Sequence, residues 1–162
     1  MSMSDIHRYY TGVGSRSTPP EICERLTELA EQLSLRGYTL RSGGAVGADR
    51  AFEEGSKLSQ VFLAGHADGD QAALALAASI HPAWHRCKPY VKLLHARNCY
   101  QVLGRTLNEP SEFVICWTPG GEDTGGTRTA ILLARGKGIP VYNLGRDGEY
   151  DRLLLEVFGE TA

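Results

Sequence analysis

The sequence has little that would suggest a secreted, membrane-bound or metal-dependent protein. Its four cysteines include no Cys-x-x-Cys pair, which argues against a zinc ribbon or a thioredoxin-like redox motif. No apolar run approaches the length needed to cross a bilayer, and the first residues have neither the cationic region nor the apolar core of a secretory signal. We therefore expect reduced cysteines, no membrane partner and a cytoplasmic location.

The chain also lacks an excess of charge of either sign. It has 17 Lys and Arg against 19 Asp and Glu, so the formal net charge is −2. A chain this balanced has no long-range electrostatic attraction for nucleic acid. Hydrophobic residues make up 42% of a length that corresponds to one domain. We therefore expect residues 1–162 to form a single domain with a sizeable core.

Short segments rich in β-branched and aromatic residues alternate with helical patterns along the chain. Strands are predicted at residues 8–14, 38–42, 60–64, 113–117 and 139–144. Helices are predicted at about residues 18–36, 48–56, 71–80, 90–107, 128–137 and 150–158. This alternation is typical of an α/β fold, and we expect a single Rossmann-like domain whose parallel sheet has about five strands and helices on both faces.

Three turns that follow predicted strands are rich in glycine. They lie after the first, second and fourth strands, at residues 12–16, 42–49 and 119–127. The carboxyl ends of parallel strands meet at one edge of the sheet, so we expect these turns to lie together. A glycine loop that opens a helix leaves N–H groups unpaired at the positive end of the helix dipole, where a phosphate binds readily. The sequence therefore predicts a site for a nucleotide-sized ligand at this edge.

The segment 81–87 raises the question of a metal site, because it contains His81, His85 and Cys87. The spacing of these residues matches no standard set of metal ligands. We therefore expect neither a metal nor a cofactor.

The order of the glycine motifs resembles that of the SLOG superfamily. Residues 12–19 and 42–49 are similar to the Gly-Ser/Thr-Arg turn and the Ser-Gly-Gly loop in the Rossmann-like core of the DNA-processing protein DprA/Smf. Arg97-Asn98 is similar to the Arg-Asn pair of that family, and residues 125–130 to its Ser-Gly-Ser/Thr-Leu-Ile-Thr-Ala segment. Pro119-Gly120-Gly121 instead resembles the start of the Pro-Gly-Gly-x-Gly-Thr-x-x-Glu motif of the LOG nucleotide phosphoribohydrolases.

The resemblance and the positions of the loops together predict which residues contact a ligand. These are Gly14, Ser15, Arg16, Ser42, Gly43, Gly44, Gly47, Arg97, Asn98, Pro119, Gly120, Gly121, Thr124, Gly125, Gly126 and Thr127. Relatives in this superfamily commonly self-associate, so the resemblance also implies a homo-oligomer.

The leading interpretation is that the chain binds a nucleotide or a nucleotide-derived small molecule, and it leaves N-glycosidic cleavage open. In the LOG family the motif glutamate assists that cleavage. Here two extra residues interrupt the loop, and Thr129 and Ala130 stand where the glutamate would be. If cleavage occurs, Asp49 or Glu122 is the expected assisting carboxylate. The alternative is a DprA-like accessory protein that binds single-stranded DNA in DNA processing or recombination.

Overall fold

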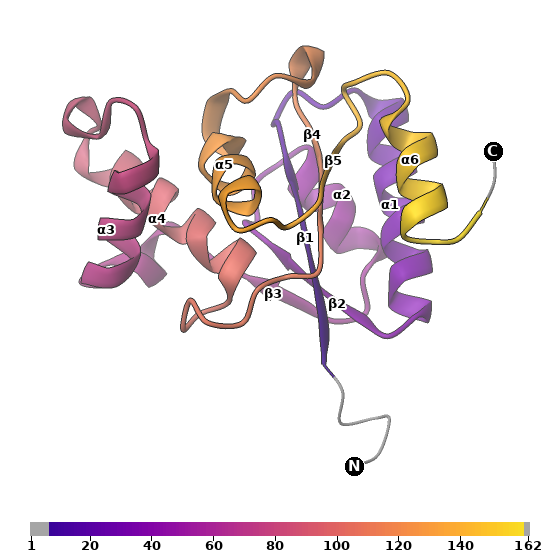
Figure 1. The fold of residues 1–162 in the computed structure, drawn as a ribbon, viewed down its shortest axis with the longest axis horizontal. Helices are drawn as coiled ribbons and strands as arrows, with labels where there is room; N and C mark the ends of the chain where they lie inside the picture. Colours follow the sequence, from indigo (N-terminus) through magenta and orange to yellow (C-terminus); the bar gives the residue numbers. More distant parts are fainter. Residues whose placement is uncertain (1–6, 161–162) are drawn as a thin grey trace.

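Parallel strands pair into the central sheet of the computed structural model, which describes residues 7–160 (Figure 1). The strands in this range are β1 (Arg8–Gly14), β2 (Tyr38–Ser42), β3 (Ser59–Val61), β4 (Val114–Trp117) and β5 (Val141–Asn143). They are hydrogen-bonded in the order β3-β2-β1-β4-β5, and every neighbouring pair is parallel. The predicted α/β Rossmann-like fold is therefore confirmed.

Helices cover both faces of the sheet (Figure 1). They are α1 (Pro20–Leu35), α2 (Ala48–Gly55), α3 (Gln71–Ile80), α4 (Pro89–Leu103), α5 (Arg128–Gly136) and α6 (Glu149–Glu156), joined in places by the short 3-10 turns η2 (Ala64–Ala67), η3 (Trp84–Arg86), η4 (Pro119–Gly121) and η5 (Gly125–Thr127). One hydrophobic cluster packs α1, α2 and α6 against the sheet, and a second packs α3, α4 and α5 against the opposite face. Successive residues of β4 belong to different clusters, since Ile115 faces the first and Cys116 the second.

Some elements are shorter than the sequence pattern predicts. Helix α4 stops at Leu103 because Gly104 takes a positive φ of 80°, although the apolar pattern continues to Leu107. Strand β5 begins only after Pro140, which has no N–H to give to a sheet. Strand β3 ends at Val61, and the chain then enters η2.

The order of the strands reverses between β1 and β4. From β1 the chain builds outward through β2 and β3, and it then returns to add β4 and β5 on the other side. The register pairs Gly14 with Trp117, so the turn after β1 and the segment after β4 begin at the same level. In open α/β sheets, such a reversal point is where ligands bind.

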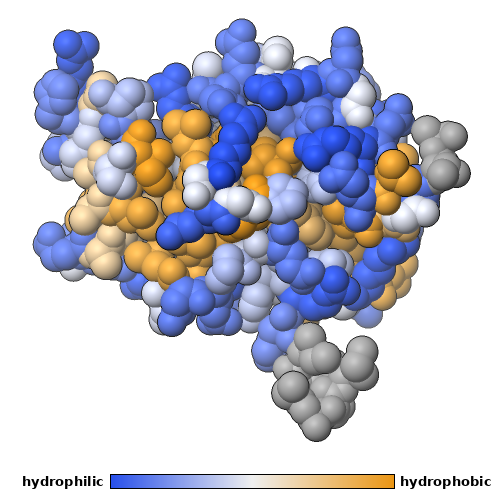
Figure 2. Space-filling model, viewed as in Figure 1, coloured by the Kyte–Doolittle hydropathy of each residue, from blue (hydrophilic) through white to orange (hydrophobic). Residues whose placement is uncertain are grey.

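Large hydrophobic side chains that remain exposed are few and come from separate elements. The exposed ones are Leu35, Val46, Leu58, Leu63, Tyr90 and Leu155. Figure 2 shows hydrophilic residues around the rim of one face, with hydrophobic residues between them over its middle. Within residues 7–160, no helix combines the length and the apolar character needed to cross a membrane.

Candidate functional site

A cavity of about 400 Å³ opens at the carboxyl edge of the sheet, where β1 and β4 end. Its walls come from the turn after β1, the loop after β2, the segment after β4 and one side of α4. The lining residues are Val13, Gly14, Ser15, Arg16, Ala45, Asp49, Val91, Leu94, His95, Arg97, Asn98, Gln101, Thr118, Pro119, Thr124, Gly125, Gly126 and Thr127. This volume is in the range of small-molecule sites.

Most of the predicted site residues meet at this cavity. Those that line it are the expected carboxylate Asp49 and the expected ligand-binding residues Gly14, Ser15, Arg16, Arg97, Asn98, Pro119, Thr124, Gly125, Gly126 and Thr127. Those that do not are Ser42, Gly43, Gly44, Gly47, Gly120, Gly121 and Glu122. The turn after β1 and the second half of the loop after β4 thus converge with the Arg-Asn pair. From the loop after β2, only Ala45 and Asp49 take part.

The glycines of the loop after β2 allow close approach between chain segments. Gly47 has a φ of 84°, and a Cβ there would lie 2.6 Å from the carbonyl oxygen of Ser15. A Cβ on Gly43 would collide with the guanidinium of Arg97. The hydroxyl of Ser42 is buried and donates to the carbonyl of Gly12 at 2.6 Å. These residues therefore shape the site from behind the cavity wall.

Asp49 occupies amides that a phosphate would otherwise use. It lies in the first turn of α2 and is 4% exposed. Its Oδ1 accepts from the N–H of Gly14 at 3.2 Å, and its Oδ2 accepts from the N–H of Ala45 at 3.3 Å. Burial raises the pKa of this carboxyl to about 6, although the nearby Arg97 guanidinium and the two N–H groups act in the opposite direction. Asp49 therefore ties the turn after β1 to the loop after β2.

Arg97 and Asn98 connect the two glycine loops. Arg97 Nη1 donates to the carbonyls of Gly43 at 2.7 Å and Phe62 at 3.1 Å, and its Nε donates to Asn98 Oδ1 at 2.9 Å. Asn98 Nδ2 donates in turn to the carbonyl of Gly126 at 2.6 Å. Within the described part of the chain, Arg97 Nη2 forms no hydrogen bond. It is the guanidinium nitrogen that remains for a ligand.

Replacing Asn98 with alanine is expected to destabilise the fold by about 1–3 kcal/mol, because the Gly126 carbonyl loses the buried amide of Asn98 and Arg97 Nε keeps only its longer bond to the Leu94 carbonyl, at 3.2 Å. The midpoint of urea unfolding measures this loss. Asn108→Ala is the control, since Asn108 is exposed, and it should change stability by less than about 0.5 kcal/mol. Equal midpoints for the two variants would contradict the bridging role.

The segment after β4 offers hydrogen-bond donors that the protein leaves unused. Among residues 7–160, the N–H groups of Gly125 and Gly126 and the hydroxyls of Thr124 and Thr127 have no hydrogen-bonding partner. They lie just before α5, where the helix dipole favours an anion. The exposed side chain of Arg16 also lines the cavity and forms no ion pair with a described residue.

Residues 120–123 of the same segment turn away from the cavity. Arg146, which follows β5, donates from Nε to the carbonyl of Gly121 at 2.8 Å. Glu122 is exposed, and Asp123 forms an ion pair with Arg135. Of the carboxylates in residues 7–160, Asp49 alone lines the cavity.

Four residues of α4 line the cavity although the sequence interpretation did not select them. They are Val91, Leu94, His95 and Gln101, which lie at helical spacing from Asn98. Residues three, four or seven positions from Asn98 lie on the same face of a helix, and this spacing could have indicated that they line the site. Burial first, and then the neighbouring His81, Arg97 and Arg128 side chains, lower the pKa of His95 to about 4. Its imidazole is therefore neutral at pH 7.

Comparison with known proteins finds similarity at the level of the fold. No protein-family model matches the sequence, and a search of curated proteins finds no match. The structure of DNA processing protein A from Helicobacter pylori is similar, with a TM-score of 0.59 and 18% sequence identity over 98% of this chain and 76% of the other. That protein's structure is described for its unique mode of binding single-stranded DNA. The chain therefore has the Rossmann-like fold of DNA processing protein A, in agreement with the resemblance of its sequence motifs.

Proposed function

We propose that this chain binds single-stranded DNA, with one phosphate of the strand held at the cavity between Arg16 and the amides of Gly125 and Gly126. The observation that carries the proposal is the set of unpaired donors around a cavity at the reversal point of the sheet. The fold is shared with a protein whose structure is described for binding single-stranded DNA.

The size and charge of the site favour a single strand over a duplex. A cavity of about 400 Å³ accommodates one nucleotide unit, and a base that is paired and stacked in a duplex would first have to leave the stack to enter it. The phosphate would meet the planar fork of Arg16 and the free Nη2 of Arg97, which suit its oxygens. The net charge of −2 adds no general attraction, so affinity rests on these few contacts.

Binding of a nucleotide-derived small molecule, with or without N-glycosidic cleavage, is the second candidate. The observation in its favour is Asp49, a buried carboxyl in the cavity wall whose pKa is raised to about 6. A carboxyl with a pKa near neutrality can donate a proton to a leaving base. Incubation with a panel of nucleoside monophosphates, followed by chromatography for free base, tests this candidate.

Fluorescence anisotropy with a labelled oligothymidylate distinguishes the two functions. We expect saturable binding at low salt, weaker binding to a duplex of equal length, and poor competition by thymidine monophosphate. Binding to the single strand should weaken as salt rises, since phosphate contacts release counterions. Failure to bind the single strand at low salt would refute the DNA proposal, and binding of the mononucleotide in that case would favour the second candidate.

Replacing Arg16 with glutamine is expected to weaken binding of single-stranded DNA about tenfold, which is the lower end of the effect of a hydrogen bond to a charged group. The slope of log affinity against log salt should fall by roughly 0.7, because one phosphate contact is lost. Arg36→Gln is the matched control, since Arg36 is exposed and follows α1 at the opposite edge of the sheet. An equal effect of both substitutions would show that only general charge matters.

A further inference from the structure

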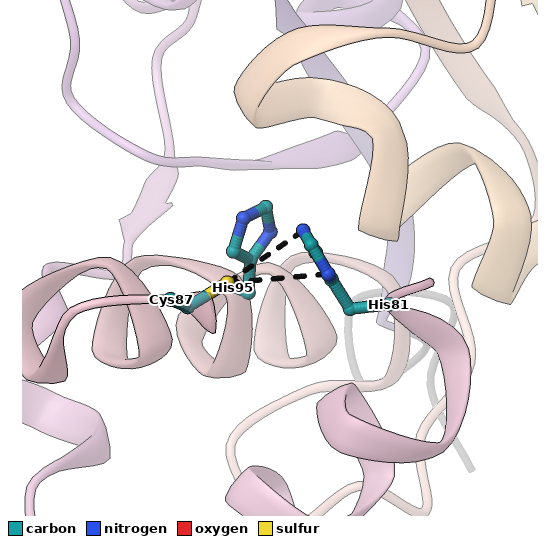
Figure 3. A group of neighbouring side chains, drawn as sticks. All are labelled: His81, Cys87 and His95. Carbon is teal, nitrogen blue, oxygen red and sulfur yellow. Dashed lines mark hydrogen bonds between the residues drawn. The ribbon is translucent and has the colours of Figure 1, made fainter. Parts of the chain in front are cut away.

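Two histidines and a cysteine from different segments meet beside the cavity (Figure 3). His81 caps the C-terminus of α3, Cys87 follows η3, and His95 lies within α4. One donor atom from each residue lies within 4.8 Å of the other two. In Figure 3 the two imidazole rings lie next to each other at a steep angle, 63° between their planes, with the thiol of Cys87 beside them.

The distances within this cluster are close to those of a metal site. The Sγ atom of Cys87 lies 3.8 Å from Nε2 and 3.9 Å from Nδ1 of His81, and the centroids of the two histidine rings are 4.5 Å apart. Zinc binds nitrogen at about 2.0–2.1 Å and sulfur at about 2.3 Å in a tetrahedron, which places two ligand atoms roughly 3.5 Å apart. Shifts of roughly 1 Å, together with a rotation of the His81 ring, would therefore bring the three donors to coordinating positions.

We propose that His81, Cys87 and His95 form a zinc site, with water as the fourth ligand. Imidazole and thiolate donors without a carboxylate suit Zn²⁺, whereas Mg²⁺ and Ca²⁺ require oxygen ligands. Three protein ligands and one open position are a common arrangement for zinc.

The surroundings of His95 support this assignment. His95 is buried, and its Nδ1 lies 2.9 Å from the hydroxyl oxygen of Thr129 in α5. This contact fixes the orientation of the ring and leaves Nε2 as the available ligand atom. Metal-binding histidines commonly have such a partner on their other nitrogen. Thr129 is therefore the positioning residue of the site.

Coordination requires a small rearrangement at His81 and Cys87. His81 Nδ1 accepts from the N–H of Ala83 at 3.0 Å, and Sγ lies almost equally far from both ring nitrogens, over the ring instead of in its plane. A rotation of the His81 ring would exchange the bond from Ala83 for a bond to the metal. The Cys87 thiol would release its proton to solvent as the zinc–sulfur bond forms. Both residues are only half-buried, which leaves room for these changes.

The site was not predicted from the sequence because its third ligand lies outside the segment 81–87. His95 comes from the following helix, eight residues after Cys87. A bound zinc would fasten the connection between α3 and α4 to α4 itself, next to the wall of the cavity that His95 also lines.

Titration of the metal-free protein with Co²⁺ and then Zn²⁺ tests the proposal. We expect one Co²⁺ per chain, a thiolate-to-cobalt charge-transfer band in the near ultraviolet, and its loss when Zn²⁺ displaces Co²⁺. Cys87→Ser should abolish the band and weaken Zn²⁺ binding roughly 100-fold or more, and Thr129→Val should weaken it about tenfold. Zn²⁺ should also raise the melting temperature of the unsubstituted protein.

Two control variants separate this site from unspecific binding. Cys23→Ser changes a half-buried thiol in α1, and His85→Gln changes an exposed histidine of η3 that lies outside the cluster. Both should bind Zn²⁺ as tightly as the unsubstituted protein. Absence of the charge-transfer band, or equal Zn²⁺ affinity in Cys87→Ser and the controls, would overturn the proposal.

Discussion

Replacing Gly126 with aspartate is expected to weaken binding of single-stranded DNA about 100-fold while leaving the fold intact. A Cβ at this position meets no atom within 4 Å, and the backbone of Gly126 does not need a positive φ. The new carboxylate would lie at the unpaired amides before α5, in place of the phosphate. Placing a like charge next to a bound group costs several kcal/mol. A loss of about 3 kcal/mol already corresponds to an affinity that is about 100-fold weaker.

Gly65→Asp is the matched control for this substitution. Gly65 lies in η2, is equally free of close contacts and does not line the cavity. Anisotropy titrations should give unchanged affinity for Gly65→Asp, and circular dichroism should show both variants folded. Gly121 would be a poor choice, because a side chain there collides with Arg146. A Gly126→Asp protein that binds DNA as tightly as the unsubstituted chain would rule out a phosphate at these amides.

The buried carboxyl of Asp49 is expected to give the fold a distinctive dependence on pH. Burial raises its pKa from the ordinary 3.8 to about 6. Between these values the folded chain holds a proton that the unfolded chain releases, so stability from this group falls as pH rises. The whole effect is about 3 kcal/mol, since each unit of pKa corresponds to about 1.4 kcal/mol, and about 2 kcal/mol of it is lost between pH 4 and pH 6. Above about pH 7 the contribution of Asp49 is constant, because the carboxyl is then ionised in both the folded and the unfolded chain.

Comparison with Asp49→Asn isolates this contribution. The stability contributed by Asp70 and Glu149 rises with pH instead of falling. Hydrogen bonds from Tyr100 and Arg152 respectively lower the pKa values of these carboxyls. These groups are present in both proteins, so the difference between the two unfolding free energies cancels them. Urea unfolding at intervals from pH 4 to pH 7 should show that difference changing by about 2 kcal/mol in favour of the variant. A difference that is constant with pH would contradict a raised pKa for Asp49.

The fold could be predicted from the sequence because its signals are local. Strands β1, β2, β4 and β5 are short runs whose residues are mostly buried, and proline or glycine marks the ends of many elements. Helix α3 occupies the predicted residues 71–80, as does strand β1 at 8–14. The end of α4 was not predicted, since the positive φ values at Gly104 and Leu107 interrupt a pattern that remains apolar.

The edge of the sheet that forms the cavity could also be predicted. The sequence could not show which loop residues line the cavity and which pack against other segments. Glycine marks both close packing and ligand approach, and the sequence does not distinguish Gly47, which lies against Ser15, from Gly126, which lines the cavity. The hydrogen bonds of Asp49 depend on tertiary contacts between the turn after β1 and the loop after β2. The hydrogen bond that the Asn98 amide donates to the carbonyl of Gly126 likewise depends on a tertiary contact.

Backbone amide chemical shifts, followed by NMR during titration with a short oligothymidylate, test the central claim most directly. We predict that the largest changes occur at Ser15, Arg16, Gly125 and Gly126, where free donors surround the cavity. They should saturate together with a single dissociation constant. Saturable DNA binding whose shift changes are confined to α1 and α6, on the other face of the sheet, would contradict a DNA site at this cavity.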